Sequence, residues 1–344
     1  MEVISGWTHR SFPMADTSFA GEARRHAVRL AGEREWSDVD SERLAIVVTE
    51  LATNLAKHTS GGELLVAARD PLEDIEVIAV DQGPGMADIG QSMSDGFSTT
   101  STAGTGLGAV SRQSDSFEVH SSETHGTVAV ARLHRRDASR PAARPGRASE
   151  APAIGFGAIC VPVKGETVCG DGWLVGRDGA RAVAFVADGL GHGPDAAAAS
   201  QKAVGEFAAH PFEQAQRVLG QVHEALRATR GAAVMAVWLG RNEAHYAGAG
   251  NVVARLISGT CDRSLVTGHG TLGLQVRRLE AATTSLPAHA MTIVHSDGIQ
   301  SRWAAQALVP MMTKDPVLMA ARLYADHSRR RDDVCIVVLR SQGE

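Results

Sequence analysis

The sequence predicts an α/β protein made of two domains. At 344 residues the chain is longer than one typical domain. Residues 18–33 and 40–58 have apolar residues at helical spacing, and apolar runs typical of strands, such as IEVIAVD, follow them. The segment 135–153 mixes Arg, Ala, Pro and Ser without either periodicity, and after it apolar runs that end in aspartate alternate with helical stretches. We therefore expect a domain over 1–134, a linker, and a domain over 154–344.

The composition is that of an ordinary globular protein. The chain is 44% hydrophobic and 21% charged, with a net charge of -5, which argues against a nucleic-acid or membrane surface. No apolar stretch is long enough to span a bilayer, and the N-terminus lacks a basic region followed by an apolar run. The four cysteines stand singly, which favours reduced thiols over disulfides or a zinc site. We expect a cytoplasmic protein.

The second predicted helix has two distinct faces. Apolar residues recur every three or four positions from Leu44 to Leu55, which defines a buried stripe. On another face Glu50, Asn54 and His58 follow one another at intervals of four. Spacing alone leaves two interpretations of this polar row, a solvated face or one wall of a site.

Three segments of the first half suit a nucleotide. Asp81 ends a strand and can accept a hydrogen bond from an exocyclic amine, while Gly83 and Gly85 let the backbone approach a planar ring. Asn54 supplies an oxygen ligand for Mg²⁺. The run GTGLG offers backbone N–H groups to phosphates, especially where a helix begins near its end. Its glycines are Gly104, Gly106 and Gly108.

The ExxxN helix motif, the DQGPG turn and GTGLG, in this order, resemble the GHKL ATPase superfamily. The run DQGPGMADIGQSMSDGFSTT…GTGLGAV is most similar to the RsbT-like serine protein kinases, and the resemblance covers residues 3–133. It implies a Bergerat-type α/β sandwich with helices on one sheet face, which binds ATP and Mg²⁺. It also implies that Glu50 activates the acceptor hydroxyl, that Asn54 holds Mg²⁺ and that Asp81 recognises adenine. Thr127 would lie near the adenine, and the five glycines would shape the pocket.

The second half has aspartates at the ends of apolar runs. Asp171, Asp188 and Asp297 each precede a glycine, and the pair Asp332–Asp333 precedes the last apolar run. Carboxylates that gather at one edge repel one another unless a cation neutralises them, which predicts Mg²⁺ or Mn²⁺. The carbonyl of Gly189 can also turn toward a metal. The plainer interpretation is that Asp-Gly pairs are common turns.

The segments DGLGHG, GDG, YAGAGN and SDG resemble the metal-dependent PPM-type serine/threonine phosphatases, in their SpoIIE-like branch. The resemblance runs from residue 154 to 340 and implies an α/β/β/α sandwich with two Mn²⁺ or Mg²⁺ ions. It implies that Asp188 bridges the metals and that Gly189 adds its carbonyl. His192 is either a general acid or a loop histidine with a structural hydrogen bond. The remaining ligands would be Asp171, Asp297 and either Asp332 or Asp333.

Together the two resemblances predict a bifunctional switch. One half would phosphorylate serine on a STAS-domain protein or an anti-sigma antagonist, and the other would remove phosphate from the same or a related partner. Two alternatives stay open. The first half could bind ATP only to control docking onto a sigma factor, a STAS-domain protein or the phosphatase half of the chain, or it could be a sensor that regulates the phosphatase.

Overall fold

The computed structural model describes residues 1–16, 18–59, 61–93, 106–136, 154–276 and 278–341. These residues form two compact units, one of residues 9–149 and one of residues 1–8 together with 150–344. The predicted boundaries placed the first eight residues in the first domain, and the structure corrects this, because they supply a strand to a sheet of the second unit. Residues 137–153 of the predicted linker lie outside the described residues.

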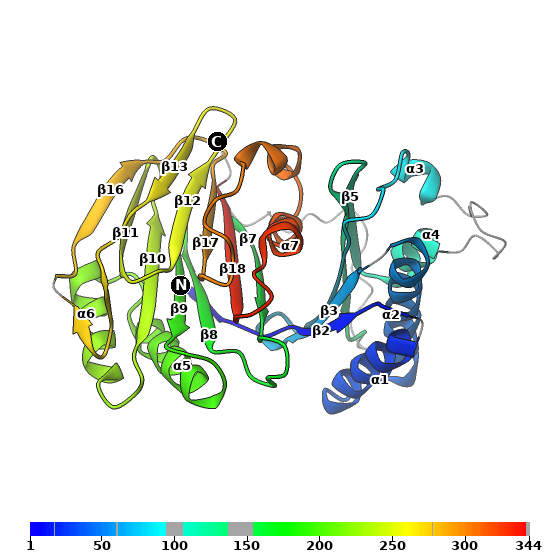
Figure 1. Ribbon diagram of the computed structural model, residues 1–344, viewed down its shortest axis with the longest axis horizontal. Helices are drawn as coiled ribbons and strands as arrows, with labels where there is room; N and C mark the ends of the chain where they lie inside the picture. Colours follow the sequence, from blue (N-terminus) through cyan, green and yellow to red (C-terminus); the bar gives the residue numbers. More distant parts are fainter. Residues whose placement is uncertain (17, 60, 94–105, 137–153, 277, 342–344) are drawn as a thin grey trace. The chain divides into compact units, whose positions relative to one another are not determined.

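The first unit is a five-stranded antiparallel sheet in the order β2-β3-β4-β6-β5, with its helices packed on one face (Figure 1). The strands are β2 (Arg10–Pro13), β3 (Glu63–Arg69), β4 (Asp74–Val80), β5 (Ser116–Ser122) and β6 (Gly126–His134). The helices are α1 (Ser18–Glu33), α2 (Asp38–His58), the short α3 (Ile89–Ser92) and α4 (Gly106–Gln113). The two predicted long helices are confirmed, the second starting two residues earlier than expected.

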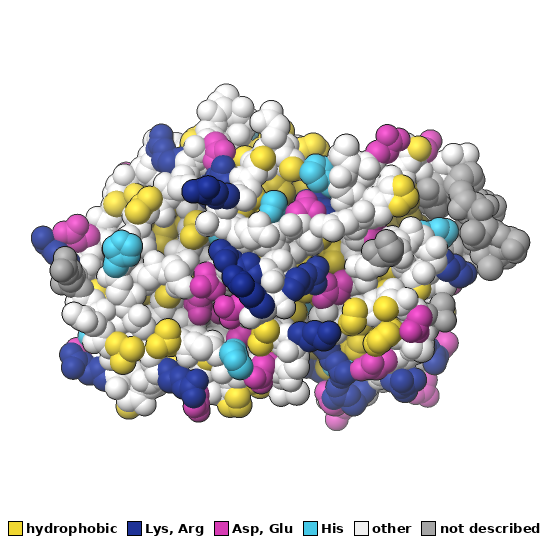
Figure 2. Space-filling view, viewed as in Figure 1, with side chains coloured by type: hydrophobic (Ala, Val, Ile, Leu, Met, Phe, Trp, Pro, Cys, Tyr) yellow, Lys and Arg dark blue, Asp and Glu magenta, His cyan; other side chains and the backbone are white. Residues whose placement is uncertain are grey.

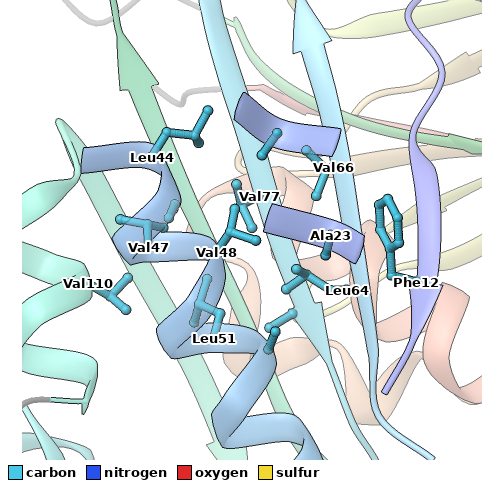
Figure 3. Packing of buried hydrophobic residues seen from close by; sticks show 14 of the residues in the cluster. Phe12, Ala23, Leu44, Val47, Val48, Leu51, Leu64, Val66, Val77 and Val110 are labelled. Atoms are coloured by element: carbon cyan, nitrogen blue, oxygen red, sulfur yellow. The ribbon is translucent and has the colours of Figure 1, made fainter. Parts of the chain in front are cut away.

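Helix α2 organises the core of this unit. It begins where the Ser37 side chain accepts a hydrogen bond from the backbone N–H of Asp40, which caps the first turn. The predicted apolar stripe is buried and packs toward Val66 of β3 and Val77 of β4 (Figure 3). Each such side chain stabilises the fold by roughly 1.5–3 kcal/mol. The polar row of Glu50, Asn54 and His58 lies on a neighbouring face of α2 and is less buried than the stripe.

The second unit contains two larger sheets, in the orders β1-β8-β9-β10-β11-β16 and β13-β12-β17-β18-β7, and a small hairpin. The first sheet consists of β1 (Glu2–Ser5), β8 (Asp171–Asp178), β9 (Arg181–Gly189), β10 (Ala232–Leu239), β11 (Glu243–Ala249) and β16 (Ala281–Ser285). The second consists of β7 (Ile154–Val161), β12 (Val253–Ile257), β13 (Asp262–Leu265), β17 (Met291–His295) and β18 (Val334–Ser341). The hairpin is β14 (Gly270–Thr271) with β15 (Gln275–Val276).

Helices cover the outer faces of these two sheets, so the predicted α/β/β/α sandwich is confirmed. Helices α5 (Pro194–Ala209) and α6 (Ala215–Leu226) pack on the first sheet, where Phe207 stacks on Phe185 with ring centroids 4.1 Å apart. Helix α7 (Pro316–His327) packs on β7 and β18 (Figure 1). A Cβ at Gly157 would overlap the backbone of Val317, so glycine permits this close approach. Within the described residues, no helix is both long and apolar enough to cross a membrane.

Candidate nucleotide pocket and metal rim

Asp81 stands at the end of β4 and is held by backbone groups of two segments. Its Oδ1 accepts hydrogen bonds from the N–H of Gly83, at 2.8 Å, and of Thr127, at 3.2 Å. The residue is 8% exposed. These two hydrogen bonds from the backbone fix the orientation of the buried carboxylate. Asp81 therefore presents a defined edge to a ligand.

Glycines surround this carboxylate and keep space around it. A Cβ at Gly83 would lie 3.0 Å from Asp81 Oδ1 and 3.2 Å from the Thr59 side chain. Gly85 has φ +69°, and a Cβ there would overlap the carbonyl of Ser122. Such a cradle, which side chains would fill, suits a planar base.

Gly126 also belongs to the cradle, although it was not among the glycines predicted to shape the pocket. It has φ +74°, and a Cβ there would lie 2.5 Å from the carbonyl oxygen of Asp81. Next to it, Thr127 shares a hydrogen bond of 2.9 Å with the hydroxyl of Ser121, which itself accepts from the N–H of Met86. The turn before Thr127, HGT, is the local feature that indicates a required glycine.

The polar row of α2 lies beside the start of α4. Glu50 and Asn54 are half-buried, and His58 is exposed. A Cβ at Gly106 would lie 3.6 Å from Asn54 Nδ2, so the first residue of α4 is next to the predicted Mg²⁺ ligand. Helix α4 begins at Gly106, close to the predicted start, and Gly108 is buried within it. The third glycine of the run, Gly104, lies outside the described residues.

The predicted metal residues meet at the ends of four strands of the second unit. Asp171 of β8 lies directly opposite Asp188 of β9 in the antiparallel pair. Asp297 follows β17, Asp332 precedes β18, and β17 pairs with β18. We call these four carboxylates and Gly189 the metal rim. Figure 2 shows acidic side chains gathered beside basic ones near β8 and β18.

Burial and neighbouring negative charges disfavour the ionised forms of the carboxylates in the metal rim. Burial, and then the charge of Asp188, raises the pKa of Asp171 well above its usual range. Burial, and then the charges of Asp297 and Asp332, raises the pKa of Asp188 to about 7. The pKa of Asp332 is raised by burial and by Asp297. Each shift means that the ionised form is penalised unless a cation is near.

The chemistry of the rim fits a hard divalent cation. Asp171 is 5% exposed, and its Oδ2 is buried without a hydrogen-bond partner. A carboxylate oxygen in that state is relieved by a cation, and oxygen ligands are those that Mg²⁺ and Mn²⁺ prefer. No group of three His, Cys, Asp or Glu side chains in the described part of the chain is already arranged around a common point.

Asp332 and Asp333, which the sequence left as alternatives, have different surroundings. Asp333 is 3% exposed, and its two oxygens accept the N–H groups of Val163, at 2.7 Å, and Gly170, at 2.9 Å. Asp332 is half-buried, and its Oδ1 accepts the N–H of Asp333 at 3.0 Å. Asp333 thus holds the connection between β7 and β8, while Asp332 has more capacity left for a metal.

Three interactions at the rim join residues that are distant in the sequence and were not predicted. Asn251 Nδ2 donates to Asp297 Oδ2 at 2.6 Å, so the hairpin residue orients a predicted ligand. His192 Nδ1 lies 2.9 Å from Glu166 Oε1, and His192 partly offsets the rise in the pKa of Asp332 that burial and Asp297 cause. The two hydrogen-bonded pairs are 46 and 26 residues apart in the chain, so no local pattern marks them.

Gly189 is fixed by the start of α5. A Cβ at this position would overlap the carbonyl of Ala196, and the N–H of Gly189 donates to the carbonyl of Gly170 at 3.2 Å. Glycine is thus required for the strand to end beside Asp188 with the helix packed against it.

The cysteines are free thiols, as predicted. The fold nevertheless brings buried cysteines together beneath the rim. Cys160 of β7 and Cys169 have their sulfur atoms 3.5 Å apart, and Cys160 lies opposite Cys335 of β18. The neighbouring thiol of Cys160, together with burial, raises the pKa of Cys169 well above its usual range, which keeps it protonated.

Comparison with known families matches each unit separately. The family described as histidine kinase-, DNA gyrase B-, and HSP90-like ATPase matches residues 39–137, and the stage II sporulation protein E family matches residues 178–342. The serine/threonine-protein kinase RsbT of Bacillus subtilis (strain 168) is 36% identical over 107 residues, which are 30% of this chain and 80% of that protein.

Two solved structures are similar in fold. A structure reported under the heading of the bacterial stressosome, a modular system adapted to control secondary messenger signaling, has a TM-score of 0.52 at 28% identity and covers 54% of this chain and 99% of its own. RsbX in complex with magnesium has a TM-score of 0.50 at 20% identity and covers 54% of this chain and 94% of its own. The resemblances to a GHKL-type kinase and to a SpoIIE/PPM-type phosphatase are thereby confirmed.

Proposed function

Because the chain belongs to the RsbT family of GHKL-type protein kinases in its first unit and has a SpoIIE/PPM-type phosphatase domain in its second, we propose that it is a bifunctional signalling switch. It adds phosphate to serine of a partner protein at the expense of ATP and removes phosphate from phosphoserine. The observation that carries this proposal is that each unit contains its own site, a glycine-lined carboxylate in one and the metal rim in the other.

In the first unit, Asp81 binds the exocyclic amine of adenine, and the glycine cradle admits the base. Asn54 is the ligand for Mg²⁺, which supplies positive charge to the phosphates when bound. Gly106 and Gly108 bring backbone N–H groups to the phosphates at the start of α4. Gly104, the third glycine predicted for this role, lies outside the described residues. Glu50, one helical turn before Asn54, orients the incoming serine hydroxyl and accepts its proton.

In the second unit, the metal rim would hold two Mn²⁺ or Mg²⁺ ions, which when bound supply positive charge and lower the pKa of water. Asp188 would bridge the two ions, since it lies opposite Asp171 in the strand pair and the charges of Asp297 and Asp332 also act on it. Asp171 and Asp297 flank it, and we favour Asp332 over Asp333 as the further ligand. His192, oriented by Glu166, donates a proton to the departing serine oxygen.

The partner is a STAS-domain protein or an anti-sigma antagonist within a sigma-factor pathway. Support comes from the similarity to RsbT and from the structure described as part of the bacterial stressosome. Because ATP is the phosphate donor, we place the switch in the cytoplasm. Nucleic acid and membrane have no role in this proposal.

The test separates the two activities with two variants. A STAS-domain partner is incubated with ATP, Mg²⁺ and Mn²⁺, and its intact mass is followed. Asp188→Asn should let phosphate accumulate, Glu50→Gln should add none, and wild type should reach a lower steady level. Asp178→Asn, which changes a partly exposed carboxylate at the far end of β8, is the control and should behave as wild type. A partner that gains no phosphate from Asp188→Asn refutes the kinase half and favours a sensor or ATP-dependent binding role.

A further inference from the structure

The first eight residues fold with the second unit, although the first unit follows them directly in the chain. β1 pairs with β8 in antiparallel register from Glu2 opposite Arg177 to Ser5 opposite Leu174. The N–H of Gly6 then donates to the carbonyl of Trp173 at 2.9 Å. β1 is the edge strand of the six-stranded sheet, and Figure 1 shows the N-terminus beside β8 and β9. Without β1, the backbone groups of β8 would form an open edge.

Buried side chains anchor this strand as well. Ile4 is 1% exposed and Trp7 is 7% exposed. The ring of Trp7 meets Trp173 of β8 edge-on, with centroids 4.6 Å apart, and lies 6.2 Å from Phe156 of β7. The indole N–H of Trp173 donates to the carbonyl of Trp7 at 3.2 Å. Side chains from both sheets of the unit therefore hold the segment, in addition to the backbone hydrogen bonds between β1 and β8.

A single residue, Thr8, separates this anchor from the core of the first unit. His9 is fully buried in the first unit, where its Nε2 lies 3.3 Å from Glu76 Oε1. In sequence, the segment held by the sheet of the second unit therefore ends one residue before the first unit begins.

We infer that residues 1–8 are a docking strand, by which the polypeptide that carries the kinase-like unit binds the β8 edge of the phosphatase-like unit. Strand addition to a sheet edge supplies affinity through backbone hydrogen bonds, and side-chain pockets supply specificity. Here the aromatic pair of Trp7 and Trp173 fills that second role. The kinase-like unit is consequently an insertion that is attached to the phosphatase-like unit at both of its ends. The contact should hold the two halves together when the chain is cut between them.

The test uses the full chain with a protease recognition sequence inserted after Arg144, inside the predicted linker. After complete cleavage, size-exclusion chromatography of the wild type should show the two fragments co-eluting. Excess synthetic peptide with the sequence of residues 1–8 should displace the N-terminal fragment. This competition needs no variant and no enzymatic readout, so its outcome is independent of the proposed function.

Two variants and a control locate the contact. In Gly6→Val the new Cβ would lie 2.7 Å from the carbonyl oxygen and indole nitrogen of Trp173, and Trp7→Ala removes the anchor. Both should let the cut fragments separate, whereas Ser5→Ala, at an exposed position of the same strand, should leave them together. Circular dichroism of the uncut variants identifies any that fail to fold. Separation of the wild-type fragments, or co-elution that the peptide does not reverse, would overturn the inference.

Discussion

Replacement of Asp188 by asparagine should stabilise the metal-free second unit at neutral and alkaline pH. Burial and the charges of Asp297 and Asp332 raise the pKa of Asp188 from 3.8 to about 7. Because the folded-state value exceeds the unfolded one, the stability associated with this group is fully present below the unfolded pKa and is lost as pH rises through the folded pKa. Asparagine keeps the shape of the side chain without the charge.

The magnitude follows from the shift itself. A rise from 3.8 to about 7 corresponds to at most about 4 kcal/mol between the ionised and protonated forms. For a unit of roughly 200 residues, this predicts a melting temperature about 5–15 °C higher for Asp188→Asn than for wild type at pH 8. At pH 4 the difference should nearly vanish.

Thermal unfolding in EDTA at pH 4, 6 and 8 measures this difference. Mn²⁺ should raise the melting temperature of the wild type at pH 8, because a cation that binds only the folded state stabilises that state. It should have little effect on Asp188→Asn, which lacks one of the proposed metal ligands. Asp178→Asn removes a partly exposed carboxylate of the same sheet and is the control. A variant that is less stable than wild type at pH 8, or a difference that does not change with pH, would refute the electrostatic reasoning.

Three further predictions follow from single residues. Asp333→Ala leaves two backbone N–H groups unpaired and should lower the stability of the second unit by about 2–4 kcal/mol in denaturant titrations, whereas Asp332→Ala should keep stability and lose Mn²⁺-dependent phosphatase activity. Gly126→Ala puts a Cβ 2.5 Å from a carbonyl oxygen at φ +74° and should weaken ATP binding about tenfold or more in calorimetry, while Gly61→Ala, also at positive φ but in open space, should bind ATP normally. Glu76→Gln breaks a buried network with two arginines and should cost about 3–5 kcal/mol. Burial alone would raise the pKa of Glu76, but the two arginines hold this pKa well below its usual range. The stability that the ionised Glu76 contributes to the wild type should therefore be present above pH 4.5 and be lost as the pH falls further. An equal loss of stability in Glu76→Gln at low and neutral pH would contradict this reasoning.

Local patterns predicted the elements that present the sites. Hydrophobic periodicity marks the apolar stripe of α2. Glycines and aspartates at element boundaries mark the helix start at Gly106 and the strands that end near Asp188 and before Asp297. The same features placed the carboxylates at strand ends, and the antiparallel pairing then brought Asp171 opposite Asp188. Such features are predictable because burial imposes them residue by residue.

Contacts between distant segments could not be predicted in this way. The strand pairing of residues 2–5 with β8 joins segments about 170 residues apart, and the short run EVIS is too brief to identify its partner. The hydrogen bond from Asn251 to Asp297 and the distinct roles of Asp332 and Asp333 also depend on tertiary neighbours. Only the tertiary packing decides which of the two adjacent aspartates accepts the backbone N–H groups of the connection between β7 and β8.

We propose that one chain both adds phosphate to a partner protein and removes it from that partner. The most direct measurement takes the phosphorylated STAS-domain partner made by Asp188→Asn, frees it of ATP, and adds Glu50→Gln with Mn²⁺. We predict that the partner returns to its unmodified mass and that the phosphoserine located by peptide mapping disappears. A phosphorylated partner that stays intact under these conditions, while a generic phosphoserine peptide is hydrolysed, would contradict the claim that the two sites act on one substrate.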